Sequence, residues 1–368
     1  MALVDGASFP RDKVCGDALS PESVAELRGL GINDALERAH FVDGSYAFAP
    51  DGNWMVTRCA ERGALLPRRH LDVLLVEQAR AMGARFLPGR RFTGLDRTQD
   101  ALIVRTDRGD GVRGRCAVLA TGCNAAALKA ADVLRGSGAP SAFGMRAYFE
   151  GVDCRPDKIV HAFDGFLLPD FGWIFPLGGG RANVGVAAHC RPGGRLRLRE
   201  KFERFTQDSP SARRFLRGAR QVSPAGTAPL RLGLTGADLV ADRLLVVGDA
   251  AGAGTPSNGE GIAPALVTGR LAAQTIRDAL QRENLSRHGL RAYGVAVRRA
   301  YGLRYRRAHW IRRLLACPTV VNLIARWGEA DPALADRLAW VLTGKHSACT
   351  LPWRELILGW HGRRTRLE

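Results

Sequence analysis

The amino-acid sequence predicts an α/β protein that has a helix-flanked parallel sheet, an inserted antiparallel sheet domain and a helical C-terminal region. Residues 244–248 form a short apolar run ending in glycine, and helical spacing of apolar side chains begins at about residue 261. A buried strand followed by a helix has this pattern. Residues 142–190 are rich in aromatic residues and glycine, and from residue 271 onward the spacing is mainly helical.

The other elements follow in chain order. Residues 1–5 are typical of the end of a strand, residues 72–82 of an amphipathic helix and residues 85–87 of the next strand, as in a crossover unit. Further strands are expected at residues 102–104 and 117–120 around a turn at 107–114, and in the sheet domain at 145–149, 165–168, 172–175 and 182–186. Glycines 178–180 indicate a hairpin turn, and residues 200–220 a charged helical excursion.

Composition sets the class of protein without naming its function. The chain has 368 residues, of which 46% are hydrophobic, enough for one interleaved pair of domains or two of ordinary size. The net charge is +18 and only five of the 54 basic residues are lysines. Arginine spread this evenly does not by itself indicate a polyanion partner. No nucleic-acid-binding motif accompanies the charge, so nucleic acid is not an expected partner.

Residues 298–313 are a more local basic signal, because seven arginines are interleaved with large apolar and aromatic side chains. Such a helix can lie on an anionic membrane surface, with its apolar side inward and its arginines at the head groups. It can equally be a solvated helix packed on the domain. Both interpretations stay open from the sequence.

The eight cysteines form no C-x-x-C pair and have no regular spacing. A disulfide framework is therefore not expected, no metal site is predicted, and the reducing cytoplasm is the expected compartment. No signal peptide is recognised, and no apolar run approaches the roughly 18 residues of a membrane span. The protein is expected to be soluble or peripheral to a membrane.

The stretch of residues 248–264 combines a strand end, a small-residue turn and a helix start. Asp249 stands where the strand ends, so its carboxylate can accept hydrogen bonds from a ligand hydroxyl. Ala250 and the two small residues after it leave room for a ligand against the backbone. The free N–H groups of a helix beginning near Gly261 favour negative charge on that ligand.

This stretch resembles the third FAD-binding motif of FAD-dependent oxidoreductases with the hydroxybenzoate-hydroxylase-type fold, and more narrowly the geranylgeranyl reductase family. Residues 9–17, which include Cys15, resemble the early signature of that family. Residues 172–176, followed by 185–187, resemble its substrate-domain motif, and residues 68–72 the start of a helix that it shares. The similarity runs from residue 5 to about residue 275.

The resemblance implies a Rossmann-like FAD-binding domain, truncated at its N-terminus and discontinuous in sequence. It comprises residues 1–35, 64–140 and 240–290, with a substrate-binding sheet domain at 36–63 and 141–239 and a helical region at 291–368. The residues that it implies for cofactor binding are Asp5, Arg68, Thr121, Gly122, Gly248, Asp249, Ala250, Pro256, Gly259, Gly261 and Ile262.

The chain departs from the family pattern at its start. A dinucleotide-binding fold opens with a strand, G-x-G-x-x-G and a helix whose N-terminus binds the pyrophosphate. Here Asp5 stands in the ribose-binding position, and no G-x-G-x-x-G follows a strand. A start codon assigned too late, a gene truncation and a separate chain supplying the unit all explain the departure. We expect the chain by itself to bind FAD weakly.

The chemistry implied by the resemblance is reduction of FAD by NAD(P)H or another electron donor, followed by hydride delivery to a carbon–carbon double bond. Trp173, Ile174, Phe175 and Pro176 are expected to line an apolar substrate tunnel, with ordinary core positions as the alternative for each. Cys15, a thiol at neutral pH, is the expected proton donor. The alternative for Cys15 is a small buried hydrophobe. Lys13 is expected to hold a phosphate or to face solvent.

Two other functions are compatible with the same scaffold. A flavin monooxygenase, or a halogenase, would activate oxygen instead, although halogenase-like relatives have a G-E-S type sequence where this chain has Cys-Gly-Asp at residues 15–17. An inactive remnant that binds lipid or a partner would explain the missing phosphate loop. The resemblance leaves the alkene open among archaeal-type lipids, a chlorophyll side chain, a menaquinone tail and a secondary-metabolite polyene.

Overall fold

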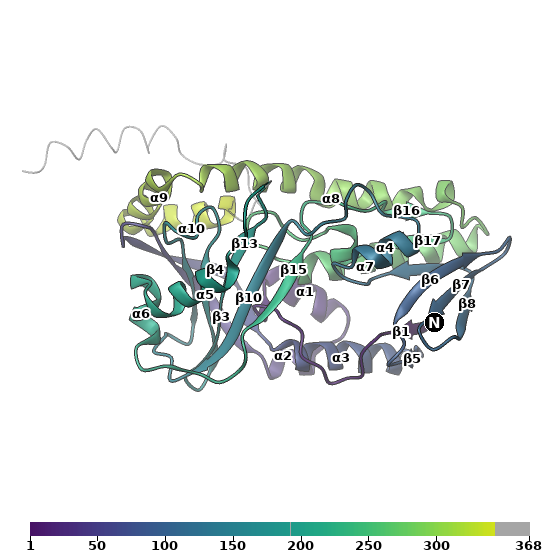
Figure 1. The fold of residues 1–368 in the computed structure, drawn as a ribbon, viewed down its shortest axis with the longest axis horizontal. Coiled ribbons are helices and arrows are strands. Elements are labelled where there is room, and N and C mark those ends of the chain that lie inside the picture. Colours follow the sequence, from purple (N-terminus) through teal and green to yellow (C-terminus); the bar gives the residue numbers. More distant parts are fainter. Residues whose placement is uncertain (192, 343–368) are drawn as a thin grey trace, which may run out of the picture.

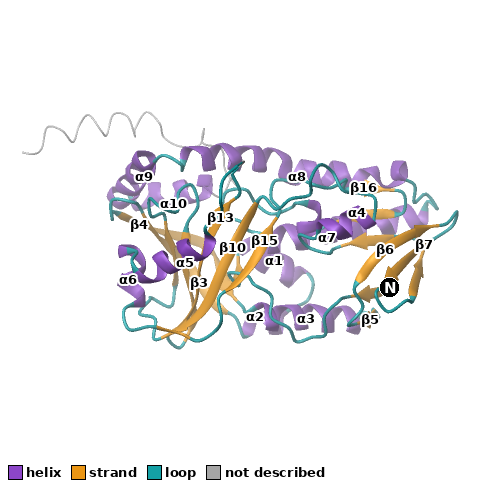
Figure 2. Ribbon diagram, in the orientation of Figure 1, coloured by secondary structure: helices purple, strands orange, loops and turns teal. Residues whose placement is uncertain are grey.

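The computed structural model describes residues 1–191 and 193–342 and consists of two halves, with one long helix running along both (Figures 1 and 2). One half contains a large twisted sheet, and the other contains several small sheets with helices around them. Helix α8 (Arg287–Leu314) runs past both halves along one side of the molecule. Cys349 and the other residues of the predicted C-terminal region beyond 342 lie outside the described part.

Two parallel strand pairs form the centre of the first half, called here the parallel half. Strand β1 (Ala2–Val4) pairs with β5 (Arg85–Leu87), and β9 (Ala117–Leu119) pairs with β17 (Leu244–Val246). All three residues of β17 are buried, as the apolar run predicts. Around these pairs lie β16 (Val240–Ala241), α3 (Arg68–Ala81), α4 (Ala125–Ala130), the short turn of 3-10 helix η1 (Gly248–Ala251), α7 (Ile262–Gln281) and the meander of β6 (Phe92–Arg97), β7 (Leu102–Thr106) and β8 (Gly111–Gly114).

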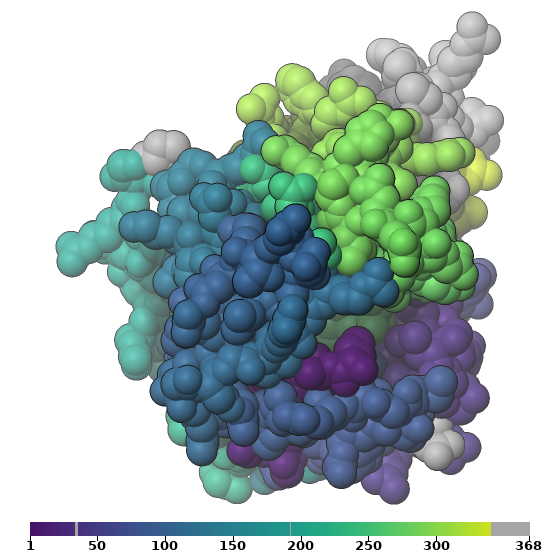
Figure 3. Space-filling view, turned by 90° about the vertical axis from the view of Figure 1, so that its right-hand side faces the viewer, coloured from purple at the N-terminus to yellow at the C-terminus, as the bar shows by residue number. Residues whose placement is uncertain are grey.

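The two parallel pairs are not hydrogen-bonded to each other within the described residues. Strand β1 has only β5 as its partner, and β9 has only β17. Strands β1 and β9 therefore each have one edge of backbone N–H and C=O groups that pairs with no strand in this part of the chain, which is unusual for a parallel sheet. Figure 3 shows atoms of β1, in purple, exposed at the end of the molecule between blue and green segments.

The second half is a nine-stranded sheet in the order β14-β10-β13-β12-β11-β3-β4-β2, with β15 also pairing with β10. Its neighbouring strands are antiparallel except for the β3–β11 pair. The bounds are β2 Ala18–Leu19, β3 His40–Phe48, β4 Trp54–Leu65, β10 Ala142–Glu150, β11 Lys158–Ala162, β12 Gly172–Gly178, β13 Arg181–His189, β14 Arg220–Gln221 and β15 Gly226–Leu230. The glycine hairpin at 178–180 joins β12 to β13, with a positive φ at all three glycines.

Helices pack against both faces of this sheet. The apolar sides of α5 (Leu198–Gln207) and α6 (Pro210–Leu216) share a core with alternate residues of β10, β12 and β13. Helices α9 (Pro318–Ala330) and α10 (Pro332–Leu342) pack against β4. Helix α1 (Pro21–Gly29), with α2 (Asn33–Glu37) beside it, packs on α7 and β4. The face opposite α5 and α6 carries Trp173 and Phe175, and there it is turned toward the segment 9–17.

Two sequence-based expectations were wrong in detail. Residues 165–168 form a turn rather than a strand. The Leu167 N–H donates to the Asp164 carbonyl, and the Asp164 carboxylate accepts hydrogen bonds from the hydroxyls of Ser209 and Ser211. The turn expected at 107–114 is shorter, since residues 111–114 form β8 and pair with β7. The helix at 72–82 and the strand at 85–87 are confirmed as α3 and β5.

The indole of Trp173 lies across two glycines of neighbouring strands. A Cβ built at Gly185 on β13 would overlap both the indole and the carbonyl oxygen of Met145. A Cβ at Gly144 on β10 would instead stand 3.8 Å from the indole, an ordinary contact. The missing side chain at Gly185 is therefore what allows Trp173 to lie flat on the sheet.

We predict that Gly185→Ala lowers the free energy of unfolding by about 1 to 3 kcal/mol, because the methyl group overpacks a site bounded by backbone. The matched substitution Gly144→Ala should change it by less than about 1 kcal/mol. Urea unfolding followed by tryptophan fluorescence measures both. Equal stability of the two variants would show that Trp173 does not rest on Gly185.

Candidate functional site

The segment of residues 9–17 is bound to the first turn of α3 by a carboxylate. Arg68, the first residue of α3, donates to Asp72 through Nε at 2.7 Å and through a terminal nitrogen at 3.0 Å. Arg11 of the segment donates to the same carboxylate at 2.9 Å. Asp72 is buried, so the two guanidinium groups supply the partners that a buried charge needs. The interaction fixes the segment against the parallel half.

Asp17 joins this segment to the large sheet. Its carboxylate is fully buried and accepts hydrogen bonds from the Tyr148 hydroxyl at 2.7 Å and the Asn183 amide at 2.9 Å. The backbone N–H of Arg68 donates to the other oxygen at 3.1 Å. Burial raises the pKa of Asp17, and the hydrogen bonds from Tyr148 and Asn183 oppose that change. The backbone of Asp17 has a φ of +62°, a conformation that aspartate tolerates better than most residues.

Cys15 lies two residues before this carboxylate. Its carbonyl oxygen accepts a hydrogen bond from the Asn183 amide at 2.8 Å, and the Asn183 oxygen accepts one from the Trp173 indole at 2.9 Å. Removal from water raises the pKa of the Cys15 thiol, and the positive charge of Arg68 opposes that rise. The thiol is therefore protonated at neutral pH, so it can donate a proton.

Aromatic side chains of the sheet lie beside the Cys15 segment. Phe175 and Trp173 stack with ring centroids 5.9 Å apart, and a Cβ built at Gly16 would stand 3.2 Å from the Phe175 ring. His161 contacts the edges of Phe171 and Phe175 at 5.1 and 5.5 Å. The four rings of His161, Phe171, Trp173 and Phe175 are called the aromatic floor. Because strand residues alternate, Ile174 and Pro176 lie on the other face of β12.

His161 is the titratable member of the aromatic floor. Partial burial among the surrounding rings lowers the pKa of its imidazole to about 4. Within residues 1–191 and 193–342 neither of its ring nitrogens has a hydrogen-bond partner. The ring is therefore neutral at physiological pH, and the floor carries no charge.

The segment after β17 has the close backbone packing expected of a cofactor site. The Gly248 N–H donates to the Thr268 hydroxyl at 3.0 Å, which holds the turn against α7. A Cβ at Gly261 would stand 3.2 Å from a carboxylate oxygen of Asp249. Gly261 is the N-cap residue of α7 and supplies no side-chain cap. Free N–H groups of this helix thus lie next to Asp249.

Unpartnered polar atoms support a polar ligand at this end of the parallel half. The Thr121 and Ser257 hydroxyl oxygens are buried and have no hydrogen-bond partner within the described residues. Thr121 and Gly122 follow β9, and Asp249 follows its parallel neighbour β17, so all lie at the carboxyl ends of adjacent strands. Ligands of open α/β sheets bind at these ends. The residues present fit the flavin ring and ribityl chain of FAD.

The phosphate end of FAD has less support. Asp5 follows β1, and its carboxylate accepts a hydrogen bond from the Ala7 N–H at 2.8 Å. No glycine-rich turn joins a parallel strand to a helix N-terminus beside β1 in the described part of the chain. A turn and helix N-terminus of that kind is where a dinucleotide pyrophosphate usually binds.

The predicted site residues fall into two groups. Cys15, Trp173 and Phe175 are brought together at the aromatic floor. Pro176 is not, and the Lys13 ammonium has no ion-pair partner within the described residues. Two residues predicted to bind the cofactor lie elsewhere: Arg68 is held by Asp72 and contacts Cys15, and Asp5 lies at the end of β1. The others follow β9 or β17 in the chain, namely Thr121, Gly122, Gly248, Asp249, Ala250, Pro256, Gly259, Gly261 and Ile262.

Sequence reasoning missed Tyr148, Asn183 and His161. A fourth missed residue of this region is Arg146, which is 2% exposed and donates to both Asp12 carboxylate oxygens at 2.7 and 2.8 Å. Its guanidinium lies 4.3 Å over the Tyr148 ring. The available signal was alternation: Arg146 and Tyr148 lie on one face of β10, and Tyr148 is directly opposite Asn183.

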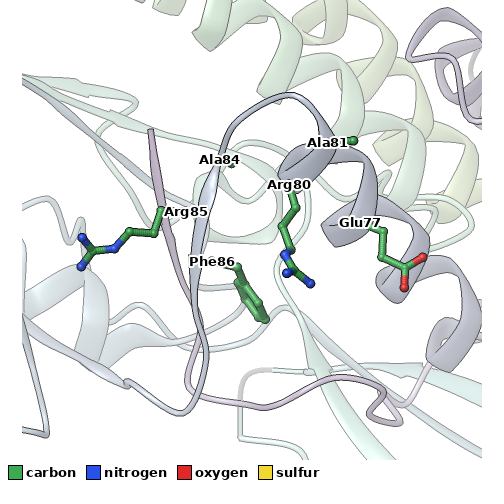
Figure 4. Close-up of a pocket in the computed structure, with 6 residues that line it drawn as sticks. All are labelled: Glu77, Arg80, Ala81, Ala84, Arg85 and Phe86. Atoms are coloured by element: carbon green, nitrogen blue, oxygen red, sulfur yellow. The ribbon is translucent and has the colours of Figure 1, made fainter.

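A surface pocket of about 590 Å³ lies between the end of α3 and β5 (Figure 4). Glu77, Arg80, Ala81, Ala84, Arg85 and Phe86 line it. Figure 4 shows the side chains of Arg80 and Phe86 on one side of the strand and Arg85 on the other. None of the predicted site residues lines this pocket, so it is separate from the aromatic floor.

No family model matches the chain. It is 30% identical over 287 residues to a menaquinone reductase of Mycobacterium tuberculosis, across 74% of this chain and 70% of that protein. It is 27% identical over 266 residues to a digeranylgeranylglycerophospholipid reductase of Methanosphaera stadtmanae, across 69% and 64% of the two chains.

Solved structures share the fold. A geranylgeranyl bacteriochlorophyll reductase-like protein of Thermoplasma acidophilum superposes with a TM-score of 0.75 at 20% identity, covering 92% of both chains. A flavin-dependent brominase superposes with a TM-score of 0.74 at 16% identity, covering 99% of this chain and 92% of that one. At these identities the structures show a common fold for both kinds of enzyme.

We predict that acid destabilises the protein partly through His161. Its folded-state pKa lies below the unfolded value, so the unfolded chain binds the extra proton first. The stabilising contribution is complete above about pH 6.5 and is lost as the pH falls toward 4. Each unit of pKa difference between the folded and unfolded states corresponds to about 1.4 kcal/mol of unfolding free energy. In His161→Phe, the loss of unfolding free energy between pH 7 and 4.5 should be smaller by about 1 to 3 kcal/mol. If the unfolding free energy of the parent and of His161→Phe changed with pH in the same way, His161 would not contribute to the acid destabilisation.

A second prediction concerns Asp249. If its carboxylate accepts hydrogen bonds from the ribityl chain, Asp249→Ala should weaken FAD binding by at least about tenfold, since such bonds contribute about 1.5 to 3 kcal/mol. Asp100→Ala, an exposed carboxylate of a turn, serves as the matched control and should bind like the parent. Quenching of flavin fluorescence during titration of the full chain measures both. Unchanged affinity in Asp249→Ala would assign the carboxylate another role.

Proposed function

Because the chain belongs to the geranylgeranyl reductase family of FAD-dependent oxidoreductases, we propose that it reduces carbon–carbon double bonds of an isoprenoid or similarly apolar substrate. One observation supports this most directly: a protonated thiol, Cys15, is held beside an uncharged aromatic floor. An isolated alkene offers no hydrogen-bonding group. Its recognition must come from buried apolar area, at about 25 cal/mol per Å².

Different residues of the chain are assigned proton donation, positioning of the thiol and binding of the alkene. FAD, when bound, supplies hydride to one carbon of the double bond. The Cys15 thiol donates a proton to the other carbon, and Asn183 fixes the Cys15 carbonyl so that the thiol keeps its orientation. Trp173 and Phe175 bind the alkene and exclude water. Arg68 shares the single Asp72 carboxylate with Arg11, so its positive charge is not cancelled and then favours the thiolate that remains.

The electron donor and the roles of two further residues belong to the same proposal. We expect NAD(P)H or another donor to reduce the flavin. Asp5 would bind the ribose of FAD, since it stands directly after a parallel strand. Lys13, with no ion-pair partner in the described part of the chain, would hold a phosphate of the substrate or the cofactor.

A flavin monooxygenase or halogenase is the alternative, and the brominase shares the fold. That likeness extends to the fold alone. The reductase relative in Mycobacterium tuberculosis is closer in sequence, at 30% identity. The Cys-Gly-Asp sequence at residues 15–17 supports a proton donor at the aromatic floor. An inactive remnant would have no reason to keep the thiol beside that floor.

The location of the protein is also part of the proposal. None of the helices within the described residues is long and apolar enough to cross a bilayer. We propose a cytoplasmic protein that reaches its apolar substrate at a membrane surface, because isoprenoid chains dissolve in lipid rather than in water. Nucleic acid is not proposed as a partner.

We predict that Cys15→Ser slows alkene reduction at least about a hundredfold, because general-acid catalysis contributes about 10²- to 10⁴-fold and a serine hydroxyl is a far weaker acid. Flavin binding should be unchanged. Cys116→Ser, a half-buried thiol of the parallel half, is the matched control. Mass spectrometry of a polyprenyl substrate should show two added hydrogens per reduced bond. Oxygen or halogen in the product would refute the reaction class, and full activity of Cys15→Ser would refute the proton donor.

A further inference from the structure

Helix α8 presents a mixed apolar and basic stripe to solvent. Its buried side consists of residues such as Leu290, Tyr293, Val297, Tyr301 and Tyr305. On the opposite side stand Val295, Leu303, Trp310 and Leu314, which are 59%, 51%, 65% and 59% exposed. They are four of the nine large hydrophobic side chains exposed in the described part of the chain. The concentration on one helix face is therefore not random scatter.

Arginines are interleaved with these residues on the same face. At 100° per residue, Arg299, Arg306 and Arg313 point within about 40° of Val295 around the helix axis. These seven residues, Val295, Arg299, Leu303, Arg306, Trp310, Arg313 and Leu314, are called the α8 stripe. It spans about 28 Å at 1.5 Å per residue. Arg313 lies 5.0 Å from the Trp310 ring, so the two side chains stand together at one end.

The positive charge of the stripe is not compensated. The sequence of α8 contains no aspartate or glutamate. Arg299, Arg306 and Arg313 form no ion pair within residues 1–191 and 193–342, whereas Arg304 on the inner side pairs with Glu22 and Glu260. The inner arginine thus serves the fold, and the outer ones remain available to an external anion.

The order of side chains favours a lipid surface over other polyanions. A nucleic acid or an acidic protein patch would pair with the arginines but gains little from exposed leucine, valine and tryptophan side chains. An anionic bilayer accepts both, with apolar side chains below the head groups, a tryptophan at the interface and arginines at the phosphates. Figure 1 shows α8 along the outside of both halves, so the stripe can meet a flat surface.

We propose that the α8 stripe docks the protein onto an anionic lipid bilayer. The inference deepens the proposed function by naming the surface through which a lipid-dissolved substrate is reached. It rests on that function only for the nature of the substrate. Binding to vesicles is measured without flavin or substrate, so failure of the docking surface and failure of the reductase activity are distinguishable.

The test is co-sedimentation of the full chain with vesicles of phosphatidylcholine alone and of equal parts phosphatidylcholine and phosphatidylglycerol. We expect binding to the anionic vesicles that weakens as salt is added. Each arginine at such a surface contributes about a fivefold gain in affinity. The charge-reversal pair Arg306→Glu and Arg313→Glu should therefore weaken binding at least about tenfold. The apolar pair Trp310→Ala and Leu314→Ala should weaken it by a similar factor without changing the salt dependence.

Matched variants remove the same chemistry elsewhere. Arg213→Glu with Arg217→Glu reverses two exposed charges at α6, and Leu30→Ala with Met82→Ala removes two exposed apolar side chains in the α1 and α3 region. Both pairs should bind like the parent, and circular dichroism checks that all variants are folded. Three results would overturn the proposal: binding that the α8 variants retain, a dimer of this chain that Trp310→Ala and Leu314→Ala split in gel filtration, and RNA binding without vesicle binding.

Discussion

The buried carboxylate of Asp17 is the interaction on which the arrangement of the site depends. It takes one hydrogen bond from Tyr148, one from Asn183 and one from the first amide of α3. A buried carboxylate without donors is costly, so the conformation of the segment 9–17 depends on contacts with both the large sheet and the start of α3. Through Asp17, the position of Cys15 is fixed relative to both the large sheet and α3.

The hydrogen-bonded groups around Asp17 lie on one side of Cys15, and the apolar rings of the aromatic floor lie on the other. Asp17, Asn183 and the Arg68–Asp72 pair lie behind Cys15 and have their partners within the protein. In front of it the aromatic floor carries no charge, since His161 is neutral and the Cys15 thiol is protonated. A substrate on the floor therefore meets the Cys15 thiol beside uncharged aromatic rings. This suits an alkene better than a substrate that must be held by several hydrogen bonds.

The sequence was sufficient for features that are local in the chain. A few adjacent residues determine each of three such features: the buried strand before Gly248, the start of α7 after Gly261 and the glycine hairpin at 178–180. Tyr148, Asn183 and His161 were missed because their roles depend on register, which pairs Tyr148 with Asn183 and places His161 opposite Trp173. Alternation assigns a residue to a face but not to a neighbouring strand. The turn at 165–168 likewise depends on distant partners, Ser209 and Ser211.

The parallel half sets different conditions for the two ends of FAD. The flavin end is prepared by adjacent parallel strands, because Thr121 and Asp249 follow β9 and β17, and α7 begins beside them. The phosphate end depends on β1, whose inner edge faces no partner strand within the described residues. Flavin affinity thus depends on the strand ends of the parallel half, while proton donation by Cys15 depends on the large sheet, so the two properties can vary independently.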